Sequence, residues 1–196
     1  MRRKVDFLEN LKLYSSLTDL SSISRRYFII GFFDGVLTLV GLVIGSYLAG
    51  HLDSELIISS GIATGLALGI SSGWGAYEAE RVEQKIQKDM KEKALLTTFK
   101  YSTFDKAHKF AVVVSSFVHA VAPILAALIV LIPFVIFNEF EAFLTSLAVA
   151  LSSLFIIGAF FGKIANLNVF FCGSRMMLAG IVTIIIVTLL SPSHLV

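Results

Sequence analysis

The chain has 196 residues, of which 56% are hydrophobic and 15% charged, and its formal net charge is +2. This composition is too apolar for a water-soluble enzyme and indicates an integral membrane protein. The single cysteine, Cys172, excludes both a disulfide framework within one chain and a cysteine-rich metal site.

Residues 1–24 carry apolar side chains at three-residue intervals beside charged and serine positions. This spacing predicts an amphipathic helix on the cytoplasmic surface of the membrane. A cleavable signal peptide is not expected, because the first long apolar run begins only after about 26 residues.

Five stretches with almost no charge follow, each long enough to cross a bilayer as a helix of roughly 20 residues. The predicted spans are residues 27–49, 56–77, 110–137, 142–162 and 176–190. We therefore expect an all-α, polytopic membrane protein. Residues 25–77 contain the first two spans, residues 78–109 a cytoplasmic helical insertion, and residues 110–196 the other three spans.

The basic residues fall on one side of this predicted membrane. All 16 Lys and Arg precede the first span, lie in residues 78–109, or flank the connection before the fifth span. By the positive-inside rule the N-terminus is cytoplasmic and the C-terminus external. Acidic residues are interspersed with the basic ones, and this pattern gives no indication of a nucleic-acid partner.

Residues 78–93 contain good helix formers and no Gly or Pro, so the second span is expected to continue into the cytoplasm. About 30 residues cannot bury a core by themselves. The insertion is therefore predicted to be a projecting helical hairpin or a segment that pairs with a second copy.

Glycines recur at four-residue intervals in the first two spans, where small residues allow helices to approach closely in lipid. We expect another helix to lie in the resulting groove, either within one subunit or across a homodimer. The glycines concerned are Gly31, Gly35, Gly41, Gly45, Gly61, Gly65, Gly69 and Gly73.

Asp34 is the one acidic residue deep in an apolar span, roughly 10 Å from its cytoplasmic end. A carboxylate at that depth is costly, so it is expected to face the protein interior or water. Thr38, Gly41 and Gly45 continue the same helix face and predict the lining of an ion path. The alternative is a carboxylate satisfied by capping or by a neighbouring hydroxyl.

His119 lies near the middle of the third span, four residues before Pro123. Proline lacks the amide that would bond the carbonyl of residue 119, which predicts a kink and a free acceptor. Histidine titrates near neutrality and ligates metals, so a role in the pathway is one interpretation. A structurally hydrogen-bonded histidine is the other.

Three glutamates, Glu78, Glu80 and Glu83, mark the point where the second span leaves the membrane. Glu80 and Glu83 share a helix face, and their spacing allows two carboxylates to hold one divalent ion. Met90 offers a further, soft ligand. The alternative is solvated carboxylates neutralised by nearby basic residues. No motif of a hydrolase, zinc protease or nucleotide-binding enzyme is present, so an enzyme is not expected.

Three segments resemble the vacuolar iron transporter family. They are Gly31-Phe-Phe-Asp-Gly-Val-Leu-Thr, Ser72-Gly-Trp-Gly-Ala-Tyr-Glu and Cys172-Gly-Ser-Arg-Met-Met-Leu-Ala-Gly. The resemblance implies a homodimer whose first spans flank a central pathway, and export of ferrous iron or similar metals in exchange for protons. Asp34 matches the family's first-span aspartate, which binds the passing cation or proton. Ala76 and Ser72 stand where the family commonly has a glutamate and a methionine.

The predicted function is therefore a secondary transporter that exports ferrous iron or manganese from the cytosol by proton exchange. The expected partners are the lipid bilayer, divalent metal ions, protons and a second copy of the chain, in the cell membrane of a prokaryote, with no tightly bound cofactor. The alternative is a non-transporting interaction or scaffold protein assembled through glycine-faced helices. The predicted pathway comprises Asp34, Thr38, Ser72 and His119, and the predicted metal ligands are Asp34, Glu78, Glu80, Glu83 and Met90.

Overall fold

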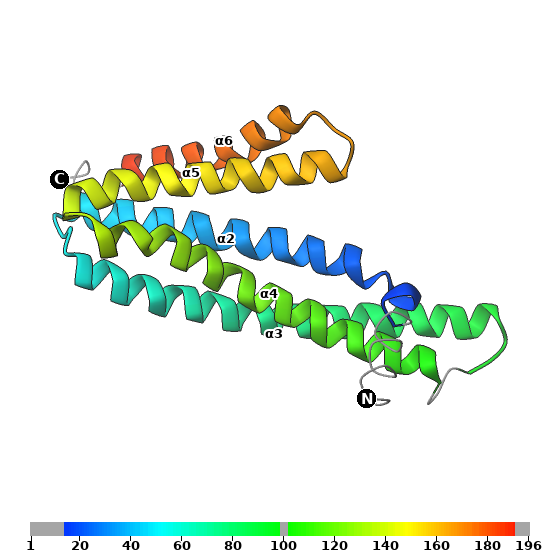
Figure 1. Ribbon diagram of the computed structural model, residues 1–196. Helices are drawn as coiled ribbons and strands as arrows, with labels where there is room; N and C mark the ends of the chain where they lie inside the picture. Colours follow the sequence, from blue (N-terminus) through cyan, green and yellow to red (C-terminus); the bar gives the residue numbers. More distant parts are fainter. Residues whose placement is uncertain (1–13, 99–101, 191–196) are drawn as a thin grey trace, which may run out of the picture. The chain divides into compact units, whose positions relative to one another are not determined.

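The computed structural model describes residues 14–98 and 102–190, and this part of the chain is helical, without a strand (Figure 1). Within these residues, five helices are long and apolar enough to cross a membrane. This confirms the prediction of an all-α protein with five candidate spans, while the orientation and the homodimer stay predictions. The helices are α2 (Leu20–Leu48), α3 (Ser54–Ala94), α4 (Thr103–Ile136), α5 (Glu139–Ile164) and α6 (Val169–Leu189).

Most helices extend beyond the uncharged stretches from which they were predicted. The second span continues without interruption into α3, which is 41 residues long. The α6 helix begins at Val169, seven residues before the predicted span, because Asn168 accepts hydrogen bonds from the N–H groups of Phe170 and Phe171. Charge therefore marks where a helix leaves the apolar region better than where the helix ends.

The N-terminal segment is divided at Asp19 in its described part. Residues 14–18 form a helical turn, and Asp19 then adopts a left-handed backbone conformation with φ 52°. This conformation interrupts the helix, and aspartate tolerates it better than most residues. Residues 20–24 consequently belong to α2. Residues 1–13 lie outside the described part, and the amphipathic helix over residues 1–24 stays a prediction.

The chain divides into two compact units, and α2, α3 and α4 each contribute to both. One unit comprises the described residues of 1–31 and 69–121. The other comprises residues 32–68 and the described residues from 122 onward. In the second unit α5 and α6 form a hairpin (Figure 1), in which a Cβ placed on Gly158 would lie 2.7 Å from the Cys172 carbonyl oxygen.

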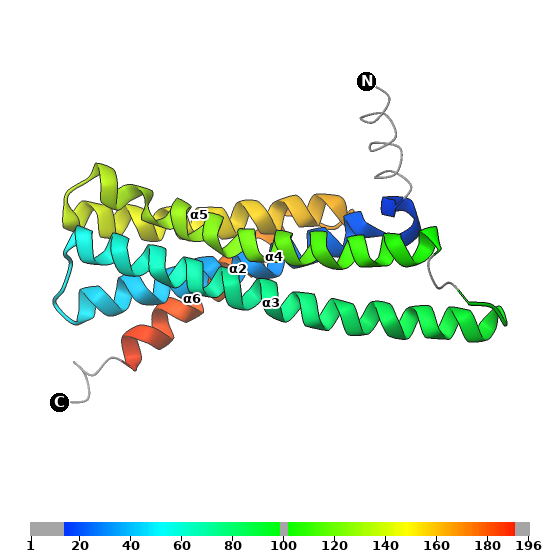
Figure 2. The ribbon, with the colours of Figure 1, turned by 90° about the horizontal axis from the view of Figure 1, so that it is seen from below.

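Gly61 and Gly65 in the second unit and Gly73 in the first face α4, which lies beside α3 in both ribbon views (Figures 1 and 2). In the second unit a Cβ on Gly65 would lie 2.6 Å from the Ala127 Cβ, and in the first unit a Cβ on Gly73 would lie 2.7 Å from the Ala120 Cβ. The α4 helix therefore fills this groove within one subunit. Of the two arrangements that the spacing left open, this is the one observed for α3.

Candidate functional site

The α2 helix has one packed face and one open face in the second unit. Val36, Val40 and Val43 are fully buried, whereas Asp34 and Thr38 are exposed. The Thr38 hydroxyl donates a 2.7 Å hydrogen bond to the Asp34 backbone carbonyl. A helix in lipid normally exposes apolar side chains, so an open face with a carboxylate and a hydroxyl requires a polar neighbour.

The same open face continues over two glycines beyond Thr38. A Cβ placed on Gly41 or Gly45 would have no neighbouring atom within 4 Å. Gly35, by contrast, approaches Pro123 and Ala126 of α4 so closely that its added Cβ would lie 2.7 and 2.8 Å from their atoms. The two later glycines are therefore not used for packing within the described chain. We call Asp34, Thr38, Gly41 and Gly45 the open stripe.

A second polar arrangement lies in the first unit, where a carboxylate is buried among three helices. Glu80 is only 2% exposed. The Tyr27 hydroxyl donates to Glu80 Oε2 at 3.1 Å, and the Gln84 amide donates to Glu80 Oε1 at 2.5 Å. His108 Nδ1 in turn donates to Gln84 Oε1. These four residues, here called the Glu80 network, connect α2, α3 and α4.

His119 lies beside this network and is hydrogen-bonded to the backbone. Its Nδ1 donates to the Tyr27 carbonyl oxygen at 2.8 Å, and the two rings lie 5.1 Å apart. His119 is 8% exposed. The geometry matches the structural interpretation of His119, and its role in the pathway stays a prediction.

The predicted metal ligands of α3 point to different surroundings. Glu78 is exposed and lies 3.7 Å from Arg81, and Met90 is 64% exposed. Glu83 is exposed and accepts a 3.0 Å hydrogen bond from Gln87. Within residues 14–98 and 102–190, no three His, Cys, Asp or Glu side chains are grouped closely enough to hold a metal ion.

Glu80 and Glu83 nevertheless line one pocket of about 610 Å³ between the start of α2 and α3. Asp19 adds a third carboxylate to its wall. The spacing of Glu80 and Glu83 thus places them at a common cavity, although the Glu80 oxygens already accept hydrogen bonds from Tyr27 and Gln84. We call this cavity the acidic pocket.

Beyond the apolar spans, the charged ends of α3 and α4 are joined by an ion pair between Lys88 and Asp105. Asp105 accepts hydrogen bonds from Lys88 at 2.6 Å and from Lys109 at 2.9 Å. The hydrogen bond from Lys88, followed by that from Lys109, holds the pKa of Asp105 below its usual range. The hydrogen bond to Asp105 in turn raises the pKa of Lys88. Burial lowers the pKa of His108, and the charge of Lys91 acts in the same direction. The ends of α3 and α4 therefore pair as a helical hairpin.

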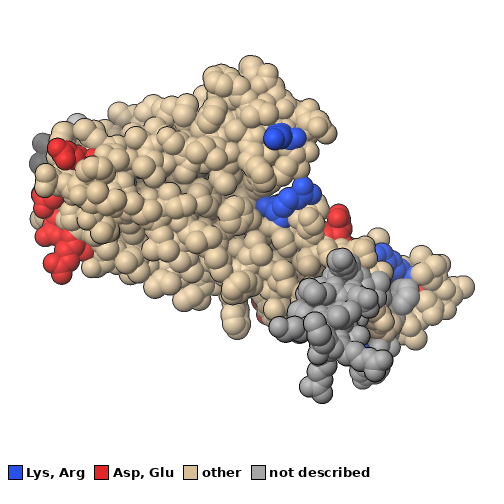
Figure 3. All heavy atoms as spheres, in the orientation of Figure 1, with Lys and Arg blue, Asp and Glu red and all other residues tan. Residues whose placement is uncertain are grey.

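Charge is separated along the helices of the second unit as well. The α5 helix has Glu139 and Glu141 in its first turn and Lys163 in its last. Figure 3 shows a group of acidic side chains at the left with no basic side chain among them, whereas the basic side chains at the right have acidic ones beside them. This separation agrees with the pattern on which the predicted orientation rests.

The sequence pattern did not identify Tyr27, Gln84 and His108 as members of the Glu80 network. Gln84 carried a signal, since it follows Glu80 by four residues on a predicted helix and such residues are neighbours. Tyr27 and His108 are 53 and 24 residues away from their partners. Their contacts depend on how three helices pack, which spacing alone does not determine.

These features define a multi-pass α-helical membrane protein with polar residues placed within its apolar helices. The sequence model of the VIT family matches residues 25–98 and 78–191. The chain therefore belongs to the VIT family, a family of membrane transporters of iron and other metals, as the resemblance indicated. It is also 29% identical over 155 residues to an uncharacterized protein from the archaeon Methanocaldococcus jannaschii, a match that covers 78% of this chain and 80% of that protein.

Proposed function

We propose that this protein is a homodimeric secondary transporter that exports a divalent transition metal, ferrous iron or manganese, from the cytosol in exchange for protons. The proposed location is the cell membrane of a prokaryote. The pathway runs along the open stripe, where Asp34 binds the cation or a proton. Membership of a family of metal transporters supports the class of function.

The observation that carries the proposal is the exposure of Asp34 and Thr38 on one face of a largely apolar helix. Hydrocarbon cannot solvate a carboxylate, so this face needs a polar or aqueous neighbour in the membrane. A second copy supplies one, because a two-fold axis places the same surface patch on both sides of an interface. Two open stripes would then face each other, with two carboxylates, two hydroxyls and room left by the glycines.

The chemistry of the stripe suits exchange of a metal for protons. Carboxylate and hydroxyl oxygens are suitable ligands for manganese and other divalent ions. A carboxylate binds such an ion only when it is deprotonated, so protonation favours release of the metal. A single carboxylate can in this way couple the export of a metal ion to the import of protons.

The cytosolic entrance is proposed at the acidic pocket, with Glu83 and Glu80 in its wall and Glu78 and Met90 nearby on α3. Negative side chains at the mouth of a pathway raise the local concentration of cations. The Glu80 carboxylate is engaged by Tyr27 and Gln84, so Glu83 is the more accessible ligand. Ser72 and His119 complete the proposed pathway as polar groups on α3 and α4.

The scaffold alternative depends on glycine faces that are free for other chains. On α3 those glycines are already covered by α4. Gly41 and Gly45, which have no neighbour within 4 Å of an added Cβ, share their face with Asp34, and a surface used only for assembly has no need of an acid within an apolar helix. The alternative predicts no metal flux and full tolerance of Asp34→Asn, so one experiment separates the two functions.

The test is metal uptake by proteoliposomes that contain the full chain. With a proton gradient, ferrous iron or manganese should accumulate, and Asp34→Asn should reduce the rate at least tenfold. Glu55→Gln is the matched control, because Glu55 is an exposed acid in the first turn of α3. Uptake by Asp34→Asn at the wild-type rate would overturn the assigned role of Asp34.

The proposed dimer has its own test by cysteine crosslinking. In a Cys172→Ser background, Gly45→Cys places a thiol where nothing lies within 4 Å in the described chain. Oxidation should give a covalent dimer in membranes. Leu66→Cys, at an exposed apolar position of α3, is the control that should stay monomeric. Equal crosslinking at both positions would reject the open stripe as the interface.

A further inference from the structure

A pocket of about 600 Å³ lies between α3 and α4 in the first unit, at the transition from apolar to charged sequence. It shares no lining residue with the open stripe and only Gln84 with the acidic pocket. We call it the basic pocket, since cationic side chains dominate its wall. It is lined by Tyr77, Arg81, Gln84, Lys85, Lys88, Asp89, Asp105, His108, Lys109, Val112 and Val113.

The charges of the basic pocket do not balance. Four cationic side chains face two carboxylates, Asp89 and Asp105, which leaves two positive charges in excess. Asp105 is already engaged by Lys88 and Lys109. Arg81 and Lys85 are exposed on α3, and Arg81 lies 3.7 Å from the exposed carboxylate of Glu78. The wall therefore favours an anionic group.

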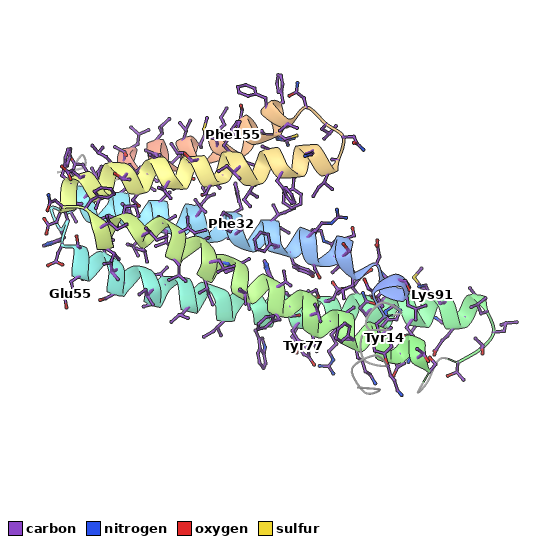
Figure 4. The ribbon with its side chains drawn as sticks, viewed as in Figure 1. Tyr14, Phe32, Glu55, Tyr77, Lys91 and Phe155 are labelled. Atoms are coloured by element: carbon purple, nitrogen blue, oxygen red, sulfur yellow. The ribbon has the colours of Figure 1, made fainter. Side chains whose placement is uncertain are left out.

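One end of the same pocket is apolar. Val112 and Val113 belong to the apolar part of α4, and Val113 is 58% exposed. Tyr77 is 36% exposed, and Trp74, one turn earlier on α3, is 71% exposed. Figure 4 labels Tyr77 on α3 and Lys91 farther along its charged part. Exposed Trp and Tyr beside an apolar helix are typical of the level of the lipid headgroups.

We propose that the basic pocket binds the phosphate-containing headgroup of an anionic phospholipid, with Arg81 and Lys85 as the main cationic contacts. The acyl chains would follow Val113 and the exposed aromatic side chains into the bilayer. Basic pockets between membrane helices on the cytoplasmic side are suited to such headgroups. A free phosphate ion could bind to the same cationic side chains, but it would make no contact with the apolar end of the pocket. The apolar end therefore favours a lipid as the source of the bound phosphate group.

Trp74 provides a direct probe, because it is the only tryptophan of the chain and its ring lies 6.5 Å from that of Tyr77. The full chain is reconstituted in phosphatidylcholine nanodiscs that contain a small fraction of brominated phosphatidylglycerol or, at the same fraction, brominated phosphatidylcholine. Bromine on an acyl chain quenches nearby tryptophan. Preferential binding at the basic pocket should make the anionic brominated lipid the stronger quencher.

The variant Arg81→Gln/Lys85→Gln removes two charges from the pocket. Each basic residue near the membrane surface contributes about fivefold to the binding of anionic lipid, so the preference should fall by about 25-fold and be lost. The control variant Lys93→Gln/Lys106→Gln removes two exposed charges from α3 and α4 outside the pocket and should keep the preference.

Equal quenching by the two brominated lipids, or equal loss in both variants, would overturn the proposal. Added inorganic phosphate distinguishes the two sources of the anion. At constant ionic strength it should leave the quenching by the anionic lipid unchanged. Displacement of the lipid by phosphate at millimolar concentration would instead identify a site for the free ion and reject the lipid.

Discussion

The contact between Gly65 and Ala127 gives the sharpest test of how α3 and α4 pack in the second unit. In Gly65→Ala the new Cβ would lie 2.6 Å from the Ala127 Cβ, about 1 Å closer than carbon atoms pack. Both methyl groups are fixed to helix backbones, so the helices must separate. Overpacking of this kind costs about 1–3 kcal/mol. From the middle of that range, about 2 kcal/mol, the higher helix propensity of alanine subtracts up to about 1 kcal/mol, which leaves a net loss of about 1–2 kcal/mol.

A double-mutant cycle isolates this contact. Ala127→Gly alone should cost about 1–2 kcal/mol, because it removes a buried methyl group and places glycine in a helix. In Gly65→Ala/Ala127→Gly the methyl group occupies the same space from the other helix. The double variant should therefore lie within about 1 kcal/mol of the wild type, with a coupling energy of about 1–3 kcal/mol. Gly41→Ala is the control, since nothing lies within 4 Å of its added Cβ.

The measurement is the free energy of unfolding of the full chain in mixed micelles, followed by far-ultraviolet circular dichroism as the denaturing detergent is increased. Gly65→Ala should unfold earlier than the wild type, and Gly41→Ala should not. Additive effects in the double variant would refute the reasoning, because they would mean that the two positions do not share one space. A harmless Gly65→Ala would refute it equally.

Three further changes test other contacts. Tyr27→Phe removes a hydrogen bond to the buried Glu80 and should cost about 1–3 kcal/mol in the same unfolding assay, unlike Tyr77→Phe at an exposed position. Ser146→Ala removes the 2.8 Å bond from α5 to the Val130 carbonyl of α4 and should cost about 0.6 kcal/mol, whereas a loss above about 2 kcal/mol would mean that more than this bond is involved. Because the folded-state pKa of Asp105 is lowered, its contribution is present above the unfolded pKa of about 3.9 and is lost as the pH falls through the folded value. The protection of backbone amides from hydrogen exchange, relative to their intrinsic rate at each pH, should therefore fall at the ends of α3 and α4 below about pH 4. Asp105→Asn should show this lower protection already at pH 7, and its protection should not fall further on acidification.

The five helices could be predicted because the bilayer imposes a simple constraint on sequence. Backbone groups in hydrocarbon must be paired within the segment, so a long apolar stretch has few alternatives to a helix. Uncharged stretches revealed the spans, and helix propensity revealed the continuation of α3 to Ala94. The start of α6 at Val169 was missed because Arg175 was treated as a boundary, although a charged residue at the membrane surface does not end a helix.

The Glu80 network shows what linear spacing cannot supply. Glu80 and Glu83 were grouped as possible ligands because they share a helix face, and they do line one pocket. Which of the two carboxylates is buried depends on the neighbours that α2 and α4 bring to α3. Tyr27 and His108 are such neighbours, and neither is identified by its distance along the chain from Glu80.

The glycines of α2 illustrate the same limit and lead back to function. Gly35 and Gly45 are both members of four-residue pairs, so spacing treats them alike, yet only Gly35 lies against α4. Gly35 allows close packing of α2 against α4 within the chain. Gly41 and Gly45 instead leave space on the helix face that also carries Asp34. Small residues beside an acid in lipid make close approach of a second polar surface feasible, and they leave room for an ion that a larger side chain would fill.

Replacing Gly45 by leucine should therefore block metal uptake while leaving the unfolding free energy of the single chain within about 1 kcal/mol of the wild type. Loss of stability without loss of uptake would assign this glycine to packing instead.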